Sequence, residues 1–301
     1  MKRRRPNRRT LYIPWVTSPF IQLFLPLAVA LVMFALGATL TVEDLRRVLL
    51  RPRAFLLGSL LHVTLLPAVA FAIALGFGPA PETAIGLVII ASCPANSSAN
   101  LFTHLSRGDT MLSVCLTAAT SLLSVLTIPF AVNLALATFP SAHATVALPV
   151  LRTSSAVFVI ATLPVMLGMA LRRRRPAAAR KIEARMSSFG LAVIAVVIVA
   201  AIWSERSRVG PALVESGALT LGLNVVAVAS AWGIATLAGI PWPQRVAIGL
   251  ECGLQNFAMA AFIALTLLGD TRLLLPAIAY GLTMWLSAGA VVALARRRSA
   301  A

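Results

Sequence analysis

The chain has 301 residues, of which 59% are hydrophobic and only 12% are charged. Apolar stretches of 18 or more residues with almost no charge recur along it, which excludes an ordinary soluble domain and predicts an all-α polytopic membrane protein. The formal net charge of +17 comes largely from basic residues between these stretches. Because they form no separate arm with interleaved aromatic residues, they favour cytoplasmic loops and argue against nucleic-acid binding.

Nine transmembrane helices are predicted, and they leave no room for a soluble domain. In chain order they cover about residues 14–40, 54–77, 83–105, 109–138, 146–170, 187–204, 217–238, 243–268 and 273–295, after a basic tail at 1–13. The basic loops at 46–53 and 172–185, with the arginines at 296–298, predict a cytoplasmic C-terminus by the positive-inside rule. Nine spans then place the N-terminus outside, which its basic tail contradicts. We follow the loops, and a further helix before residue 1 would remove the conflict.

The second span carries one titratable side chain, His62 in GSLLHVTLLP. Histidine changes its protonation state near neutral pH, so His62 is a candidate proton carrier. The alternative is a neutral imidazole that is hydrogen-bonded inside the helix bundle.

Polar residues interrupt the third span, where SCPANSSANLF follows the apolar run AIGLVIIA. Pro94 cannot donate a backbone hydrogen bond and tends to break the helix. The small polar side chains after it can satisfy freed carbonyl groups or contact an ion: Asn96, Ser97, Ser98 and Asn100. In the fourth span, hydroxyl side chains share one helix face, which suits either helix packing or ligation of a small cation: Ser113, Thr117, Thr120, Ser121 and Ser124.

The eighth span contains GLECGLQNFAMA at 249–260, and Glu251 is the only one of the nine acidic residues that lies well inside a span. An ionisable group there costs at least ~2.5–3.5 kcal/mol on insertion scales and by default marks an ion or substrate path. The alternative is a protonated carboxyl group that is hydrogen-bonded to a neighbouring helix. Gly253, Gln255 and Asn256 follow closely, so this span is also interrupted at a polar centre.

The two interrupted spans lie in opposite halves of the chain and run in opposite directions. Paired broken helices in inverted halves are typical of the midplane site of a secondary transporter. The alternative is two independent kinks that are packed with small polar side chains.

These motifs resemble those of the bile acid:sodium symporter family, and the likeness runs through most of the chain. ECGLQNFAMA resembles the family's E-x-G-x-Q-N motif, and residues 93–129, from CPANSSANLF to the proline of VLTIP, are similar to its crossover-helix signature. MFALGATLTVEDLRRVLLRPRA (33–54), HVTLLPAVA (62–70) and LPAIAYGLTMWLSAG (275–289) resemble its opening block, its proline-containing helix and its final helix.

The resemblance implies an inverted repeat of ten helices, or of nine where the first is missing, with two crossed, broken helices. The first repeat is expected at 14–138 and the second at 146–296. A panel domain would contain the helices at 14–40 and 146–204, and a core domain those at 54–138 and 217–295.

The resemblance also implies three groups of functional residues. A first sodium site would use Asn100, Ser113, Thr117 and Glu251. A second would use His62, Glu251, Cys252, Leu254 and Gln255. A substrate cavity would involve Ser97, Ser98, Asn256, Met284 and Trp285.

Three departures from the family pattern bear on these expectations. Ala99 stands where the family often has a serine that helps to hold sodium. His62 replaces a glutamine, and imidazole is a poor sodium ligand, so the second site is in doubt. Met284 and Trp285 stand where bile-acid-binding members have His and Asn, which predicts a different substrate.

Together, the motifs and the resemblance predict a secondary active transporter of the bacterial inner membrane. It would import an organic anion with sodium by alternating access, without a cofactor beyond the coupling ion, and would not be an enzyme. One alternative is proton coupling through Glu251 and His62. A weaker alternative is an intramembrane metal-dependent enzyme that uses the same two residues, and a structural or receptor role is a third.

Overall fold

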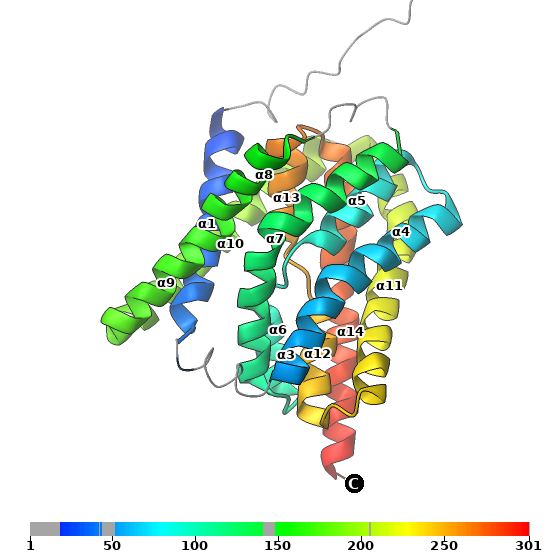
Figure 1. The fold of residues 1–301 in the computed structure, drawn as a ribbon. Coiled ribbons are helices and arrows are strands. Elements are labelled where there is room, and N and C mark those ends of the chain that lie inside the picture. The colour runs from blue at the N-terminus through cyan, green and yellow to red at the C-terminus, as the bar shows by residue number, and fades with distance from the viewer. Residues whose placement is uncertain (1–18, 42, 44–51, 141–147, 205, 301) are drawn as a thin grey trace, which may run out of the picture.

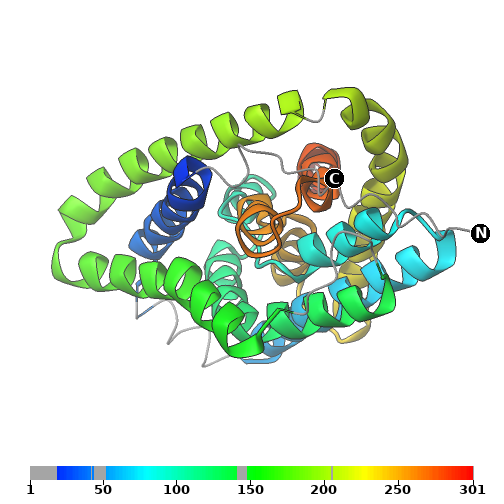
Figure 2. The same ribbon diagram turned by 90° about the horizontal axis from the view of Figure 1, so that it is seen from above.

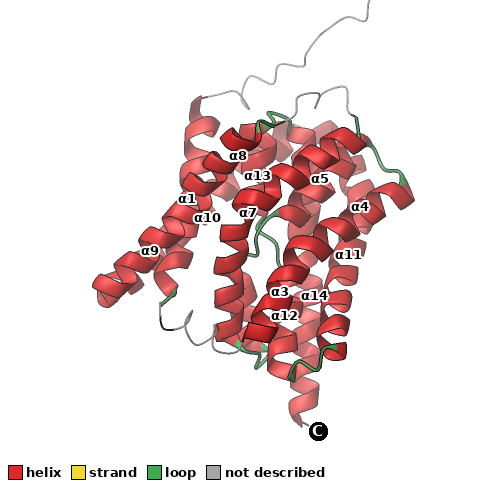
Figure 3. Cartoon of the chain, in the orientation of Figure 1, coloured by secondary structure: helices red, strands yellow, loops and turns green. Residues whose placement is uncertain are grey.

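The structure, a computed structural model, describes residues 19–41, 43, 52–140, 148–204 and 206–300 (Figure 1). Within these residues every regular element is a helix (Figure 3). Seven helical segments are long and apolar enough to cross a membrane: Gln22–Thr39, Pro52–Phe77, Thr110–Thr138, Val150–Arg174, Pro176–Ala200, Val214–Leu237 and Thr271–Arg297. The prediction of an all-α polytopic membrane protein is therefore confirmed.

The elements follow one another closely along the chain. They are α1 (Pro19–Thr39), α3 (Pro52–Leu60), η1 (Leu61–Leu65), α4 (Leu66–Phe77), α5 (Pro81–Ser92), α6 (Ser98–Leu105), α7 (Thr110–Thr138), α8 (Val150–Val157), η2 (Phe158–Thr162), α9 (Leu163–Arg174), α10 (Pro176–Ser204), α11 (Arg206–Leu237), α12 (Trp242–Gly253), α13 (Phe257–Phe262), η3 (Ile263–Leu267), η4 (Thr271–Leu274) and α14 (Leu275–Ala300). The turns η1, η2 and η3 are π-helical and continue the helices around them, whereas η4 is a 3₁₀ turn.

The predicted spans correspond to these seven segments and to two interrupted ones, α5–α6 and α12–α13–η3. Two predicted boundaries are wrong, because α10 begins at Pro176 and not near residue 187, and α11 begins at Arg206 and not near residue 217. Proline suits the first position of a helix, and Ala, Arg, Lys and Glu favour helix, so the basic stretch that looked like a loop is helical. The basic tail at 1–13 and most of the basic loop at 46–53 lie outside the described residues.

The helices pack in two sets whose members alternate along the chain. One set is formed by α1, α9 and α10, which pack against one another. Here α1 and α9 approach closely: a β-carbon on Gly37 would lie 2.1 Å from the Val165 carbonyl oxygen, and one on Gly168 would lie 2.2 Å from that of Phe34. In the other set, α5 packs against α4, α7 and α14, while α11 packs against α12 and α14. The division into a panel and a core domain stays a prediction.

Seen from above, α5, α13 and α14 lie toward the middle of the bundle, while α10 and α11 run along its outside (Figure 2). Large apolar side chains are exposed on outer helix faces; Leu151, Val214 and Leu237, for example, are 84%, 81% and 90% exposed. Such faces are expected where a helix contacts lipid.

The ends of α1, α9 and α14 and the turn between α11 and α12 lie on the lower side in Figure 1. Arginines are concentrated at this end, at the last turn of α9 and the end of α14. This distribution is typical of a cytoplasmic face, and the cytoplasmic C-terminus stays a prediction.

Candidate cation-binding site

The two broken helices cross, and their extended connectors are paired. α5 ends at Ser92 and α12 ends at Gly253, and the short connectors that follow run antiparallel to each other. The Asn96 N–H donates to the Leu254 carbonyl at 3.0 Å, and the Asn256 N–H donates to the Pro94 carbonyl at 2.9 Å. Each connector thus satisfies backbone groups that the other leaves unpaired, as a non-helical segment at membrane depth requires. The predicted crossing is confirmed.

Each connector carries an asparagine within two residues of the point where the helix resumes. The Asn96 side chain accepts from the Ser98 N–H at 2.8 Å and donates to the Gln255 carbonyl at 3.1 Å. Asn256 accepts from the Met259 N–H at 3.1 Å and so caps α13. These contacts explain why both interruptions carry an amide side chain after the helix breaker. The amide oxygen accepts an N–H from the first turn of the next helix and so helps that helix to start.

Four side chains from three helices meet beside this crossing. The Ser113 hydroxyl on α7 lies 2.9 Å from Asn100 Oδ1 on α6 and 3.3 Å from Glu251 Oε2 on α12. Thr117 Oγ1, one turn further along α7, lies 3.4 Å from Asn100 Oδ1. The structure therefore brings together all four residues of the predicted first sodium site.

Glu251 is only 1% exposed, and its two carboxylate oxygens differ in their surroundings. Oε2 lies near the Ser113 hydroxyl, whereas Oε1 is buried without a hydrogen-bond partner. An ionised carboxylate in such a place is costly unless a cation compensates it. An amide oxygen, two hydroxyls and a carboxylate are the hard oxygen ligands that small hard cations prefer. These residues therefore fit a sodium ion.

Thr103 is an addition that the sequence reasoning missed. Its hydroxyl lies 3.3 Å from that of Ser113, and the residue is fully buried. Thr103 lies one turn after Asn100 on the short helix α6. In the sequence, only the polar residues that directly follow Pro94 were considered, and Thr103 lies beyond them.

The residues of the predicted second sodium site bond mainly to nearby backbone groups. His62 Nε2 lies 3.0 Å from the Cys93 carbonyl, so this nitrogen carries the proton, and Nδ1 is buried without a partner. The Gln255 amide donates to the Cys252 carbonyl at 3.0 Å, while its Oε1 is buried without a partner. The Leu254 carbonyl accepts the Asn96 N–H of the crossing. The described residues hold no group of three or more His, Cys, Asp and Glu side chains suited to a metal ion.

The break in α12 is held by two side chains that the sequence reasoning did not consider. Asn224 on α11 and Tyr280 on α14 donate to the Gly253 carbonyl at 2.6 and 2.9 Å, and they contact each other at 2.9 Å. This anchors the broken end of α12 to both helices that flank it. Asn224 is the only amide side chain in its apolar span, which was a usable signal.

The five predicted cavity residues lie in different environments. Ser97 is exposed and Ser98 partly buried, whereas Asn256 is buried and caps α13. The Asn256 amide also approaches the Met33 sulfur of α1 at 3.9 Å, so α1 reaches the crossing. Met284 is fully buried. The half-exposed Trp285 lies against Phe102 of α6, with ring centroids 5.6 Å apart.

A sequence model of the Sodium Bile acid symporter family matches residues 26–210, more than half of the chain. The chain belongs to this family. Its membership bears out the resemblance of the motifs.

Individual members are similar along most of the chain. The uncharacterized sodium-dependent transporter YocS of Bacillus subtilis is 27% identical over 259 residues, covering 83% of this chain and 74% of YocS. The rabbit (Oryctolagus cuniculus) ileal sodium/bile acid cotransporter is 25% identical over 82% of this chain and 71% of its own length. The probable sodium/metabolite cotransporter BASS1 of Arabidopsis thaliana chloroplasts is 25% identical over 81% of this chain, which spans 59% of BASS1.

Proposed function

We propose that the protein is a secondary active transporter that imports an organic anion together with sodium by alternating access. The observation that carries this proposal is the buried Glu251, with Oε1 unpartnered, beside the oxygens of Asn100, Ser113 and Thr117 where two broken helices cross. Its relatives, which are named as sodium-dependent transporters or sodium cotransporters, support sodium as the coupling ion.

The coupling follows from where the four ligands are attached. Asn100 belongs to one broken helix and Glu251 to the other, while Ser113 and Thr117 belong to α7, which packs against both. A sodium ion held by these oxygens neutralises the carboxylate and links the three helices. The ion can favour a substrate-binding arrangement only by binding more tightly to it than to the alternative. The core would then move relative to the panel and expose the site on the other side.

An anionic substrate suits the helix termini at the crossing. The Asn96 side chain accepts the N–H of Ser98, the first residue of α6, and Asn256 caps α13; the N-terminal ends of both helical halves carry partial positive charge. Phe102 on α6 and Trp285 on α14 offer aromatic surface. Hydroxy acids, keto acids and sulfonated sterols are suitable test anions, and the bacterial inner membrane is the proposed location.

The test is uptake of these labelled anions into proteoliposomes under an inward sodium gradient, with potassium as the control. Glu251→Gln keeps the size of the side chain and removes its charge, so we expect it to abolish sodium-driven uptake. The matched control is Glu215→Gln. Glu215 is exposed on α11 and accepts the Ala80 N–H at 3.0 Å, away from the crossing. Wild-type uptake in Glu251→Gln would refute the proposal.

Proton coupling is the second candidate, and one observation favours it. His62 is buried beside the Cys93 carbonyl, and its Nδ1 lacks a partner and is open to a proton. Uptake driven by an inward proton gradient without sodium, and lost in His62→Gln, would replace sodium with protons as the coupling ion. Sodium-driven uptake that survives in His62→Gln would reject this candidate.

A further inference from the structure

A hollow of about 570 Å³ runs along one face of α9, near the arginines of the last turn of this helix. It is lined by Met166, Met169, Ala170, Arg173 and Arg174. These positions follow the pattern i, i+3, i+4, i+7, i+8, so they form a single stripe on the helix. The hollow belongs to neither the crossing nor the proposed cation site.

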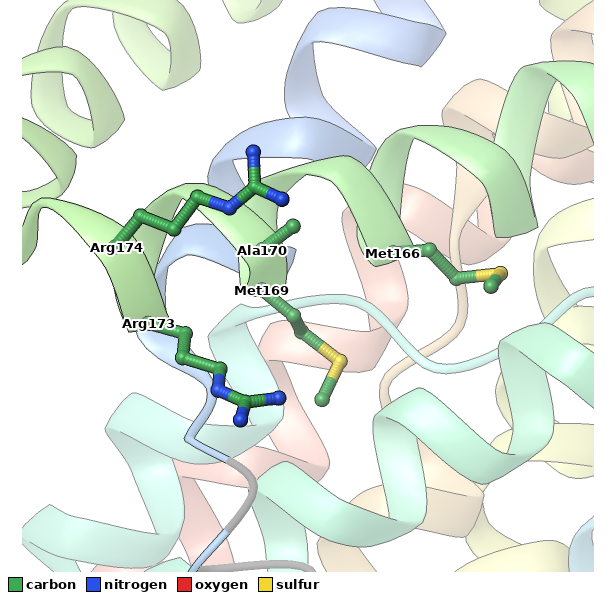
Figure 4. Close-up of a pocket in the computed structure, with 5 residues that line it drawn as sticks. All are labelled: Met166, Met169, Ala170, Arg173 and Arg174. Atoms are coloured by element: carbon green, nitrogen blue, oxygen red, sulfur yellow. The ribbon is translucent and has the colours of Figure 1, made fainter.

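The stripe changes its chemistry along the helix axis. Toward the membrane interior it presents the apolar side chains of Met166, Met169 and Ala170, and in the last helical turn it presents two guanidinium groups. Figure 4 shows the Arg173 and Arg174 side chains extending to either side of Ala170 and Met169 and leaning back along the helix. This direction is usual for helical side chains, and here it places positive charge beside the apolar surface.

A second hollow, of about 360 Å³, adjoins the first through Arg173. It is lined by Thr41 and Glu43 from the end of α1 and by Arg172 and Arg173 from the end of α9. Across both hollows three arginines stand against one glutamate, so the combined surface has a positive charge. Thr41 and Glu43 make the rim of the second hollow polar.

We propose that this face of α9 binds an anionic phospholipid of the inner leaflet, with the phosphate at Arg173 and Arg174 and the upper acyl chains on Met166 and Met169. The order of chemistry along the stripe is that of such a lipid, from acyl chain to phosphate to polar headgroup. Basic pockets on the cytoplasmic side of membrane proteins are suited to these headgroups. A zwitterionic lipid would lack the net negative charge that the three arginines favour.

The test measures lipid binding to the detergent-purified full chain by native mass spectrometry. Phosphatidylglycerol is compared with phosphatidylcholine, and Arg173→Gln/Arg174→Gln with the wild type. Because each arginine near an anionic surface contributes about 1 kcal/mol, we expect the double variant to bind phosphatidylglycerol about 30-fold more weakly. The matched control is Arg296→Gln/Arg297→Gln, which removes two exposed arginines from the end of α14. It should bind within about twofold of the wild type.

Two further measurements distinguish a lipid site from a site for soluble phosphorylated anions. Glycerol 3-phosphate, which has the phosphate but no acyl chain, should not compete at concentrations that saturate the lipid, and Met169→Gln should weaken phosphatidylglycerol binding. Equal weakening in both double variants would mean that only total charge matters, and it would overturn the proposal. So would competition by glycerol 3-phosphate, which would indicate a site for soluble phosphorylated anions. Circular dichroism and a monodisperse elution profile check that each variant is folded.

Discussion

Replacing Glu251 by Gln separates the charge of this side chain from its shape. The amide has nearly the same volume, and its oxygen can still accept from the Ser113 hydroxyl, which lies 3.3 Å from Glu251 Oε2. The substitution removes an ionised group whose second oxygen is buried without a partner. In potassium we therefore expect Glu251→Gln to be at least as stable as the wild type.

In sodium the two proteins should differ. A site with a Kd near 10 mM, exposed to 300 mM sodium, stabilises the folded state by about 2 kcal/mol through mass action. A gain of this size corresponds to a rise of a few degrees in melting temperature. The wild type should show this rise, and Glu251→Gln should show none, because sodium would lose its only charged ligand.

The assay is a thermal melt in detergent, in sodium and in potassium at equal ionic strength, with Glu215→Gln as the control. The control keeps the crossing intact and should retain the full sodium effect. A sodium-specific rise of equal size in Glu251→Gln would refute the reasoning. So would a large loss of stability in potassium, because it would mean that the carboxylate is structural.

Three further substitutions have expected outcomes in the same melt. Ser113→Ala should raise the sodium concentration for half-maximal stabilisation about five- to tenfold, whereas Ser124→Ala, whose hydroxyl bonds to the Ser121 carbonyl, should not change it. Tyr280→Phe removes one of two donors to the Gly253 carbonyl and should cost about 1 kcal/mol equally in both salts. Gly37→Ala would put a β-carbon 2.1 Å from the Val165 carbonyl oxygen, so it should lower the free energy of unfolding by about 3 kcal/mol or more. In Gly217→Ala the new β-carbon would meet nothing within 4 Å, so this control should lower it by no more than about 0.5 kcal/mol. Three results would contradict these expectations. They are an unchanged sodium concentration for half-maximal stabilisation in Ser113→Ala, a loss of stability in Tyr280→Phe that differs between the two salts, and equal stability of the two glycine variants.

The local features of the crossing could be predicted because each has a local cause. Pro94 lacks the N–H that would continue the hydrogen bonding of α5, and it is followed by small polar residues, unlike Pro26 and Pro129, which lie inside helices. A carboxylate inside an apolar span requires compensation. The grouping of Asn100, Ser113, Thr117 and Glu251 was implied by the family resemblance, and the structure brings these side chains together. Whether they hold sodium stays a proposal.

The pairing of the two connectors could not be predicted from local sequence. Asn96 could have bonded to many carbonyl groups, and its pairing with Leu254 depends on how the two halves of the chain pack. Asn224 and Tyr280 act through the Gly253 carbonyl, which is distant in sequence from Asn224 and on another helix from both, so their contact with it could not be predicted from the residues around them. The start of α10 at Pro176 was missed because an apolar window ignores the helix propensity of charged residues.

The most direct test of the central claim is equilibrium binding of sodium-22 to the purified protein. We expect saturable binding that unlabelled sodium displaces and potassium does not, lost in Glu251→Gln and unchanged in Glu215→Gln. Absence of saturable binding, or equal binding in Glu251→Gln, would contradict a sodium site at the helix crossing.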